Sequence, residues 1–180
     1  MKSDTILIDN QGSGFAAAVE ETRKVAQFRG IDHKGAIQLQ LMTEEMLSLI
    51  HSVTGEVQAS FWLETEGSAF DLCLTTKTLM DSEKRYMLLE SASSRKNEAA
   101  HSFLGKLRDA FEEAMAADIS QALHHYQEIP DDAANDIYNR CIDDPDWDRY
   151  EQSILLRLAD NVRISIKGNL VKMTVSKKFG

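Results

Sequence analysis

The sequence predicts an α+β fold, a two-layer α/β sandwich in which a largely antiparallel sheet carries helices on one face. Two hairpin patterns are the main reason: residues 57–78 and 162–175 are rich in branched and aromatic residues, and each is interrupted by a short turn with a glycine. Helical patterns precede the first hairpin and separate it from the second. Because strands and helices do not alternate regularly, a doubly wound parallel sheet is not expected.

The first helix is expected to follow a short apolar segment, residues 6–8, and to run from Gly14 to Gly30. Glycine is suited to the left-handed conformation that ends many helices. Apolar and small side chains recur at helical spacing through this stretch: Phe15, Ala18, Val19, Thr22, Val25 and Ala26. A second helix is expected from a cap at Asp32 to about Val53.

The second helix carries two rows of side chains at helical spacing, and it is therefore predicted to be buried on more than one side. The stronger row is apolar: Leu39, Met42, Met46, Leu49, Ile50 and Val53. The weaker row consists of Ile37, Leu41, Glu44 and Ser48. Burial raises the pKa of a carboxyl group toward the range of a general base, which makes Glu44 and its neighbour Glu45 candidate acids. Alternatively, these carboxylates reach solvent or pair with Arg or Lys.

The first hairpin is expected to join strands at residues 57–65 and 70–78 through Glu66-Gly67-Ser68. Its first strand alternates apolar and polar residues, except that Trp62 occupies a polar position. One face of the sheet is therefore expected to be packed and the other at least partly wet. A short helix is expected after Asp81, and a long helix is expected over 97–126, ended by Pro130. A further helix is expected to be capped by Asp144 or Asp146 and to run through Leu158, and the closing strands are expected at 162–166 and 170–175.

Composition indicates one globular domain, residues 1–180, with a net charge of −9. This charge argues against a nucleic-acid binder and against docking on anionic lipid, so neither partner is expected. No apolar run approaches the roughly 20 residues that span a bilayer, and the first residues lack a signal-peptide pattern, so a cytoplasmic location is expected. Cys73 and Cys141 are interpreted as free thiols, since nothing indicates a disulfide.

Local motifs provide no complete catalytic set and no metal site. Gly12-Ser13-Gly14 lacks the residues of a P-loop and is interpreted as a turn and cap. The acids at 144–148 lack the glycine and glutamate of a calcium loop. His124 and His125 point about 100° apart on a helix and cannot jointly hold a metal. Basic residues at 95–96 and 106–108 suit a phosphate or acidic partner, or form an ordinary solvated helix face.

Two segments resemble the histidine-kinase-type ATPase superfamily, GHKL, and within it the branch of anti-sigma factors and serine kinases. Residues 154–166, Ile-Leu-Leu-Arg-Leu-Ala-Asp-Asn-Val-Arg-Ile-Ser-Ile, are similar to the last helix and strand entry of that branch, and 167–175 to its closing hairpin. Residues 43–50, Thr-Glu-Glu-Met-Leu-Ser-Leu-Ile, resemble its N-box helix. The resemblance implies the family's ATPase fold, with a helical insert at about 97–145.

The resemblance also implies roles for particular residues, and several of the family's groups are missing. Glu44 stands where the family has the glutamate that activates water, but Ser48 replaces the asparagine that holds Mg²⁺. Residues 74–78 contain neither the adenine-reading aspartate nor the glycines of the next box. Residues 149–151 contain no glycine where the phosphate-binding box is expected, and Gly105-Lys106 is the only nearby Gly-Lys pair.

Loss of the contacts to adenine, to Mg²⁺ and to the phosphates of the nucleotide should abolish phosphoryl transfer. The resemblance then implies a degenerate, non-catalytic regulatory module that needs no cofactor and binds a protein in signalling or transcription through 97–145, with a homodimer left open. The alternative is a divergent ATP-binding protein, ATPase or serine kinase with Mg²⁺, in which Glu44 is the base and Ser48 with Lys106 or Arg95 contacts the nucleotide. An unrelated small-molecule enzyme is a third hypothesis.

Overall fold

The computed structural model describes residues 1–9, 13–55, 58–100, 110, 112–114 and 155–180. Its strands are β1 (Ile6–Ile8), β2 (Ala59–Glu66), β3 (Ala69–Lys77), β4 (Asn161–Lys167) and β5 (Leu170–Lys178). Its helices are α1 (Phe15–Phe28), α2 (His33–Thr54), α3 (Ser82–Glu90) and the 3-10 turn η1 (Glu98–Ala100). Residues 155–158 form a further helical turn before β4.

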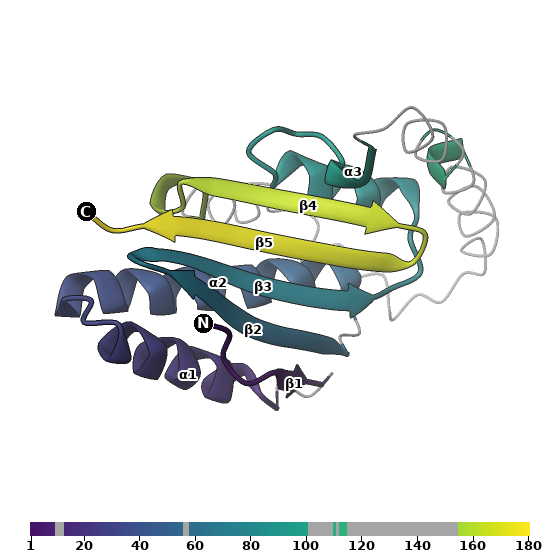
Figure 1. Cartoon of the computed structure of the whole chain (residues 1–180). Helices are drawn as coiled ribbons and strands as arrows, with labels where there is room; N and C mark the ends of the chain where they lie inside the picture. The colour runs from purple at the N-terminus through teal and green to yellow at the C-terminus, as the bar shows by residue number, and fades with distance from the viewer. Residues whose placement is uncertain (10–12, 56–57, 101–109, 111, 115–154) are drawn as a thin grey trace, which may run out of the picture.

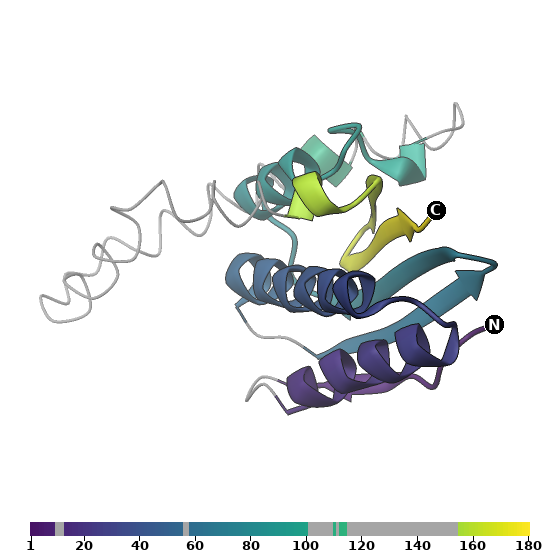
Figure 2. The same ribbon diagram turned by 90° about the vertical axis from the view of Figure 1, so that its left-hand side faces the viewer.

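The strands form one antiparallel sheet in the order β1-β2-β3-β5-β4 (Figure 1). The helices α1 and α2 lie side by side on one face, as the turned view in Figure 2 shows. α3 packs beside α2 and β4. The α+β class, the antiparallel sheet and the helical layer predicted from the sequence are thus confirmed for the described part of the chain.

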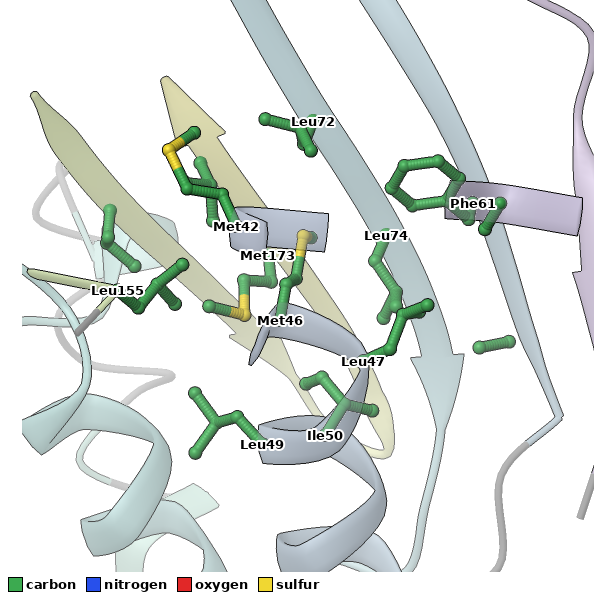
Figure 3. Packing of buried hydrophobic residues seen from close by; sticks show 14 of the residues in the cluster. Met42, Met46, Leu47, Leu49, Ile50, Phe61, Leu72, Leu74, Leu155 and Met173 are labelled. Carbon is green, nitrogen blue, oxygen red and sulfur yellow. The ribbon is translucent and has the colours of Figure 1, made fainter. Parts of the chain in front are cut away.

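The core lies between the sheet and α2. The stronger row of α2, from Leu39 to Val53, is buried throughout. Figure 3 shows Met42 and Met46 facing Leu72 and Leu74 of β3 and Met173 of β5. Burial of side chains of this size is the dominant favourable contribution to folding, at roughly 1.5–3 kcal/mol each. The sheet therefore depends on α2 to cover its apolar face.

Helix ends and turns follow the chemistry of particular residues. Asp32 caps α2, because its carboxylate accepts a hydrogen bond from the Gly35 amide at 2.8 Å. Two-residue turns join both hairpins, and their glycines, Gly67 and Gly168, have positive φ of 57° and 55°. Both predicted hairpins and the first helices are confirmed. The apolar segment at 6–8 is an edge strand, which the sequence did not indicate.

The helix α2 is buried on more than one side, as predicted, but the weaker row does not form the second buried side. Ile37 is 49% exposed, and Glu44 and Ser48 are also exposed. The second buried side of α2 instead faces α1, where the hydroxyls of Thr22 and Thr43 lie 3.0 Å apart. Threonine is compatible with this helix–helix contact because its hydroxyl also donates to a carbonyl of its own helix, as both residues do here.

The outer edge of β4 is covered by the segment after α3. The Asn97 amide group donates to the Ile166 carbonyl at 3.0 Å and accepts from the Ile166 amide at 2.8 Å. Ser93 makes the equivalent pair of bonds with Val162, at 2.9 and 2.8 Å. The segment therefore satisfies backbone groups that an edge strand would otherwise expose to other chains. The predicted start of a long helix at Asn97 is wrong, because the Asn97 side chain hydrogen-bonds to the edge of β4 and the 3-10 turn η1 follows it.

Several predictions lie outside the described residues. They concern most of the long helix over 97–126, the stop at Pro130, the insert to residue 145, and the cap at Asp144 or Asp146. In the part of the chain that is described, no helix is both long and apolar enough to cross a bilayer.

Candidate functional site

Glu44 and Ser48 lie on the outer side of α2, one helical turn apart, and both are exposed. The burial on which the role of Glu44 as a tuned base depended is absent. The neighbouring Glu45 is half-buried, and its Oε2 is shielded from solvent. The structure therefore separates these adjacent acids: Glu44 faces solvent, and Glu45 turns partly into the protein.

The cations considered as nucleotide ligands do not gather around Glu44 in the described residues. Arg95 follows α3 in a left-handed conformation, with φ of 51°, and its guanidinium lies 3.6 Å from the Glu90 carboxylate. Its side chain is 73% exposed, so this ion pair contributes little. Lys106 and Arg108 lie outside the described residues, as do His124, His125 and Cys141.

The turn before α1 is closed by a carboxylate. Asp9 accepts a hydrogen bond from the Ser13 amide at 2.9 Å, while its own amide donates to the Ser13 carbonyl at 3.2 Å. The Ser13 amide, which would have to donate to a bound phosphate, therefore already donates to the Asp9 carboxylate, and the negative charge of that carboxylate would repel a phosphate. The interpretation of this stretch as a turn and cap is confirmed for Ser13 and Gly14; Gly12 lies outside the described residues.

The first acid after β3 is Asp81, and it also has a local role. Its carboxylate accepts a hydrogen bond from the Lys84 amide at 2.8 Å and lies 3.6 Å from the Lys84 ammonium. Asp81 is therefore the N-cap of α3, and the short helix expected after Asp81 is confirmed.

The sheet face opposite α1 and α2, here called the open face, holds a cluster of polar and aromatic side chains. Figure 1 looks onto this face. At its centre the Trp62 indole donates to Glu64 at 2.8 Å. The ammonium groups of Lys2 and Lys172 lie 4.5 and 5.9 Å from the Trp62 ring centre. These distances are in the range of cation–π attraction, so Trp62 is held by charged neighbours.

A second network crosses the open face from β3 to β4. The Ser176 hydroxyl donates to Asp71, and the Arg163 guanidinium lies 3.7 Å from the same carboxylate. A hollow of about 430 Å³ adjoins these residues, and Glu98, Lys172 and the Cys73 thiol also line it. The face is thus wet, as the alternation in the first hairpin predicted. The cluster itself was not predicted, although Trp62 at a polar position was its one signal in the sequence.

Cys73 lies on this face but is only 3% exposed. Burial raises the pKa of its thiol from 9.0 to about 11, and the charge of Glu64 adds to the rise. Since the thiolate is the nucleophile, the folded protein should react sluggishly. No disulfide involves Cys73.

We expect iodoacetamide to alkylate Cys73 about a hundredfold more slowly at pH 8 in the folded protein than in urea, because a two-unit rise in pKa lowers the thiolate fraction by that factor. A Cys141→Ser variant makes Cys73 the only thiol for this measurement. The unfolded chain loses this proton at lower pH than the folded one, so stability should fall from about pH 9 to pH 11. Equal alkylation rates with and without urea would contradict the prediction.

Within the described ranges, no three His, Cys, Asp or Glu side chains are placed to hold a metal ion. No protein-family model matches the chain, and no curated protein matches it. The interpretation of its function therefore depends on the geometry of its own side chains.

Proposed function

We propose that this chain is a non-catalytic regulatory domain that binds another protein, built on the sandwich of the histidine-kinase-type ATPases. The order of elements supports this proposal: a strand, two helices, a hairpin, a helix and a closing hairpin. The same order is what the resemblance in residues 43–50 and 154–175 implies. The described sheet and helical layer are compatible with many α+β proteins, so the family assignment rests on the resemblance.

One observation carries the non-catalytic part of the proposal: the groups nearest to nucleotide-binding roles are engaged elsewhere or isolated. Asp81 caps α3, and the Ser13 amide is bound to Asp9. Glu44 is exposed beside Ser48, a short neutral ligand that is poorly suited to Mg²⁺. Phosphoryl transfer depends on several such groups acting together, and isolated ones provide little catalysis.

The alternative, an ATP-binding protein or ATPase with Glu44 as base, makes a different prediction for thermal unfolding. A ligand at about 100 times its dissociation constant adds roughly 2.7 kcal/mol of stability. We expect millimolar Mg-ATP to leave the melting temperature of the full chain unchanged, and ATP hydrolysis to be equal in the wild type and in Glu44→Ala. A clear rise in melting temperature, with turnover lost in Glu44→Ala, would establish the alternative.

Protein binding is tested with the full chain immobilised and exposed to extract from its own source. A specific, stoichiometric partner is expected. Sedimentation of the purified chain, over a range of concentrations, separates a partner from self-association. If neither a partner nor self-association is detected, the proposal fails.

A further inference from the structure

One end of the open face is basic because strand register brings lysines together there. Lys77 of β3 pairs with Leu170 of β5, which in turn pairs with Lys167 of β4. Lys172 lies two residues beyond Leu170, and two-residue spacing places both side chains on the same face. All three lysines are exposed. The turn between β4 and β5 and the end of β3 lie at the right-hand side of the sheet in Figure 1, and this end, with Lys77, Lys167 and Lys172, is here called the basic end.

The lysines of the basic end have no carboxylate partner in the described residues. The ion pairs between described residues do not include Lys77, Lys167 or Lys172, and the ammonium of Lys172 lies over the Trp62 ring. Glu98 and Lys172 line the same hollow on the open face. In a chain with a net charge of −9, a group of unneutralised cations on one face is unusual.

The basic end also presents apolar side chains around a hollow. Leu7 is 75% exposed and Leu170 is 42% exposed. Between them lies a hollow of about 720 Å³, which Ser60, Thr75 and Lys77 also line. Asp9 borders it, with its carboxylate bound to the Ser13 amide. An apolar side chain can enter such a hollow while neighbouring acids reach the lysines.

A second copy of the chain that docks through its own open face fits this end less well. Its own open-face acids are already engaged, Asp71 by Ser176 and Arg163, and Glu64 by Trp62. Of the acids that the described strands place on that face, Glu66 is the one without such a contact. A nucleic acid is disfavoured by the overall negative charge, which repels a polyanion at long range. The free positive charge therefore favours a foreign acidic polypeptide.

We propose that the basic end binds an acidic segment of a partner protein, with an apolar side chain of that segment in the hollow between Leu7 and Leu170. This inference rests on the proposed function as a protein-binding domain. It places the partner surface on the sheet, whereas the resemblance placed it on residues 97–145. Lys77, Lys167 and Lys172 supply the charge complementarity, and they also steer the encounter.

The test uses a short synthetic peptide in which glutamates flank one leucine, titrated into the full chain by calorimetry. We expect saturable binding that weakens with added salt. Reversal of the three lysines in Lys77→Glu/Lys167→Glu/Lys172→Glu should weaken binding by about tenfold or more. The reversed variant should in turn bind the same peptide carrying lysines in place of glutamates. The matched control is Lys34→Glu, an exposed position on α2, which should bind like the wild type.

Trp62 reports where the peptide binds, because Lys172 lies against its ring. In a Trp147→Phe variant Trp62 is the only tryptophan, so its emission should change on peptide addition. Thermal unfolding of each lysine variant verifies that it is folded. The inference is overturned if the acidic peptide does not bind, or binds the triple variant as it binds the wild type. It is also overturned if an oligonucleotide of equal charge binds more tightly, or if the same lysines instead mediate self-association.

The two proposals can fail separately. If the triple variant still captures the partner that the wild type captures, the docking surface is wrong and the protein-binding function stands. If the wild type captures no partner and does not self-associate, the proposed function fails.

Discussion

Gly14→Ala is expected to lower the free energy of unfolding by about 2–4 kcal/mol, from backbone strain together with a steric clash. Gly14 precedes α1 with φ of +95°, a conformation that side chains with a Cβ rarely adopt. A Cβ at this position would also overlap the carbonyl oxygen of Leu7 in β1. Because that contact is with backbone, it can be relieved only by shifting β1 or the start of α1.

The matched control is Gly30→Ala. Gly30 has a φ of +71°, but no atom lies within 4 Å of the position of its Cβ. This variant should therefore lose only the cost of the left-handed conformation, about 1–2 kcal/mol. Urea unfolding of both variants separates the two contributions. Equal losses in the two variants would show that the contact with Leu7 has no energetic consequence.

Asn97→Ala is expected to destabilise the protein by about 2–4 kcal/mol, because it leaves the buried amide and carbonyl of Ile166 without the partner they have now. Asn97 is 7% exposed and bonds both groups of Ile166. It thus takes the place of a neighbouring strand at the edge of β4. The variant should also expose that edge, so we expect it to aggregate at lower concentration than the wild type.

Ser94→Ala is the control for Asn97→Ala, since Ser94 is exposed and makes only long hydrogen bonds of 3.5 and 3.3 Å within its own loop. It should change stability by less than about 0.5 kcal/mol. Urea unfolding and light scattering measure the two effects. A loss of stability in Ser94→Ala equal to that in Asn97→Ala would indicate general sensitivity of the loop and not a role at the edge.

The local elements were largely predictable because their signals lie within a few residues of one another. A glycine turn between alternating strands identifies each hairpin, and a carboxylate before an apolar row identifies the starts of α2 and α3. Asp32 was expected as a cap and a short helix was expected after Asp81, and the carboxylates of both residues accept a hydrogen bond from a backbone amide of the first helical turn. Each feature has its physical cause in local backbone geometry and hydrogen bonding.

The candidate site was much less predictable, because burial depends on which neighbour covers a residue. The sequence shows that Ile37, Leu41, Glu44 and Ser48 share a face of α2, but not whether another element packs there. α1 packs instead on the side of Thr43, so Glu44 is left in solvent. Trp62 was the exception to the alternation in its strand, yet the two cations beside its ring come from distant positions, Lys2 and Lys172.

The spacing of apolar residues, the turn residues and the helix caps were enough to specify α1, α2, α3, the two hairpins and the antiparallel class of the sheet, because these depend on interactions between near neighbours. Three other features depend on contacts between residues distant in the chain. They are the pairing of β3 with β5, the hydrogen bonds between Asn97 and β4, and the position of the lysines at one end of the open face. Such contacts are chosen by the packing of the whole core and leave no local pattern. For this protein, the groups proposed to bind a partner are among them.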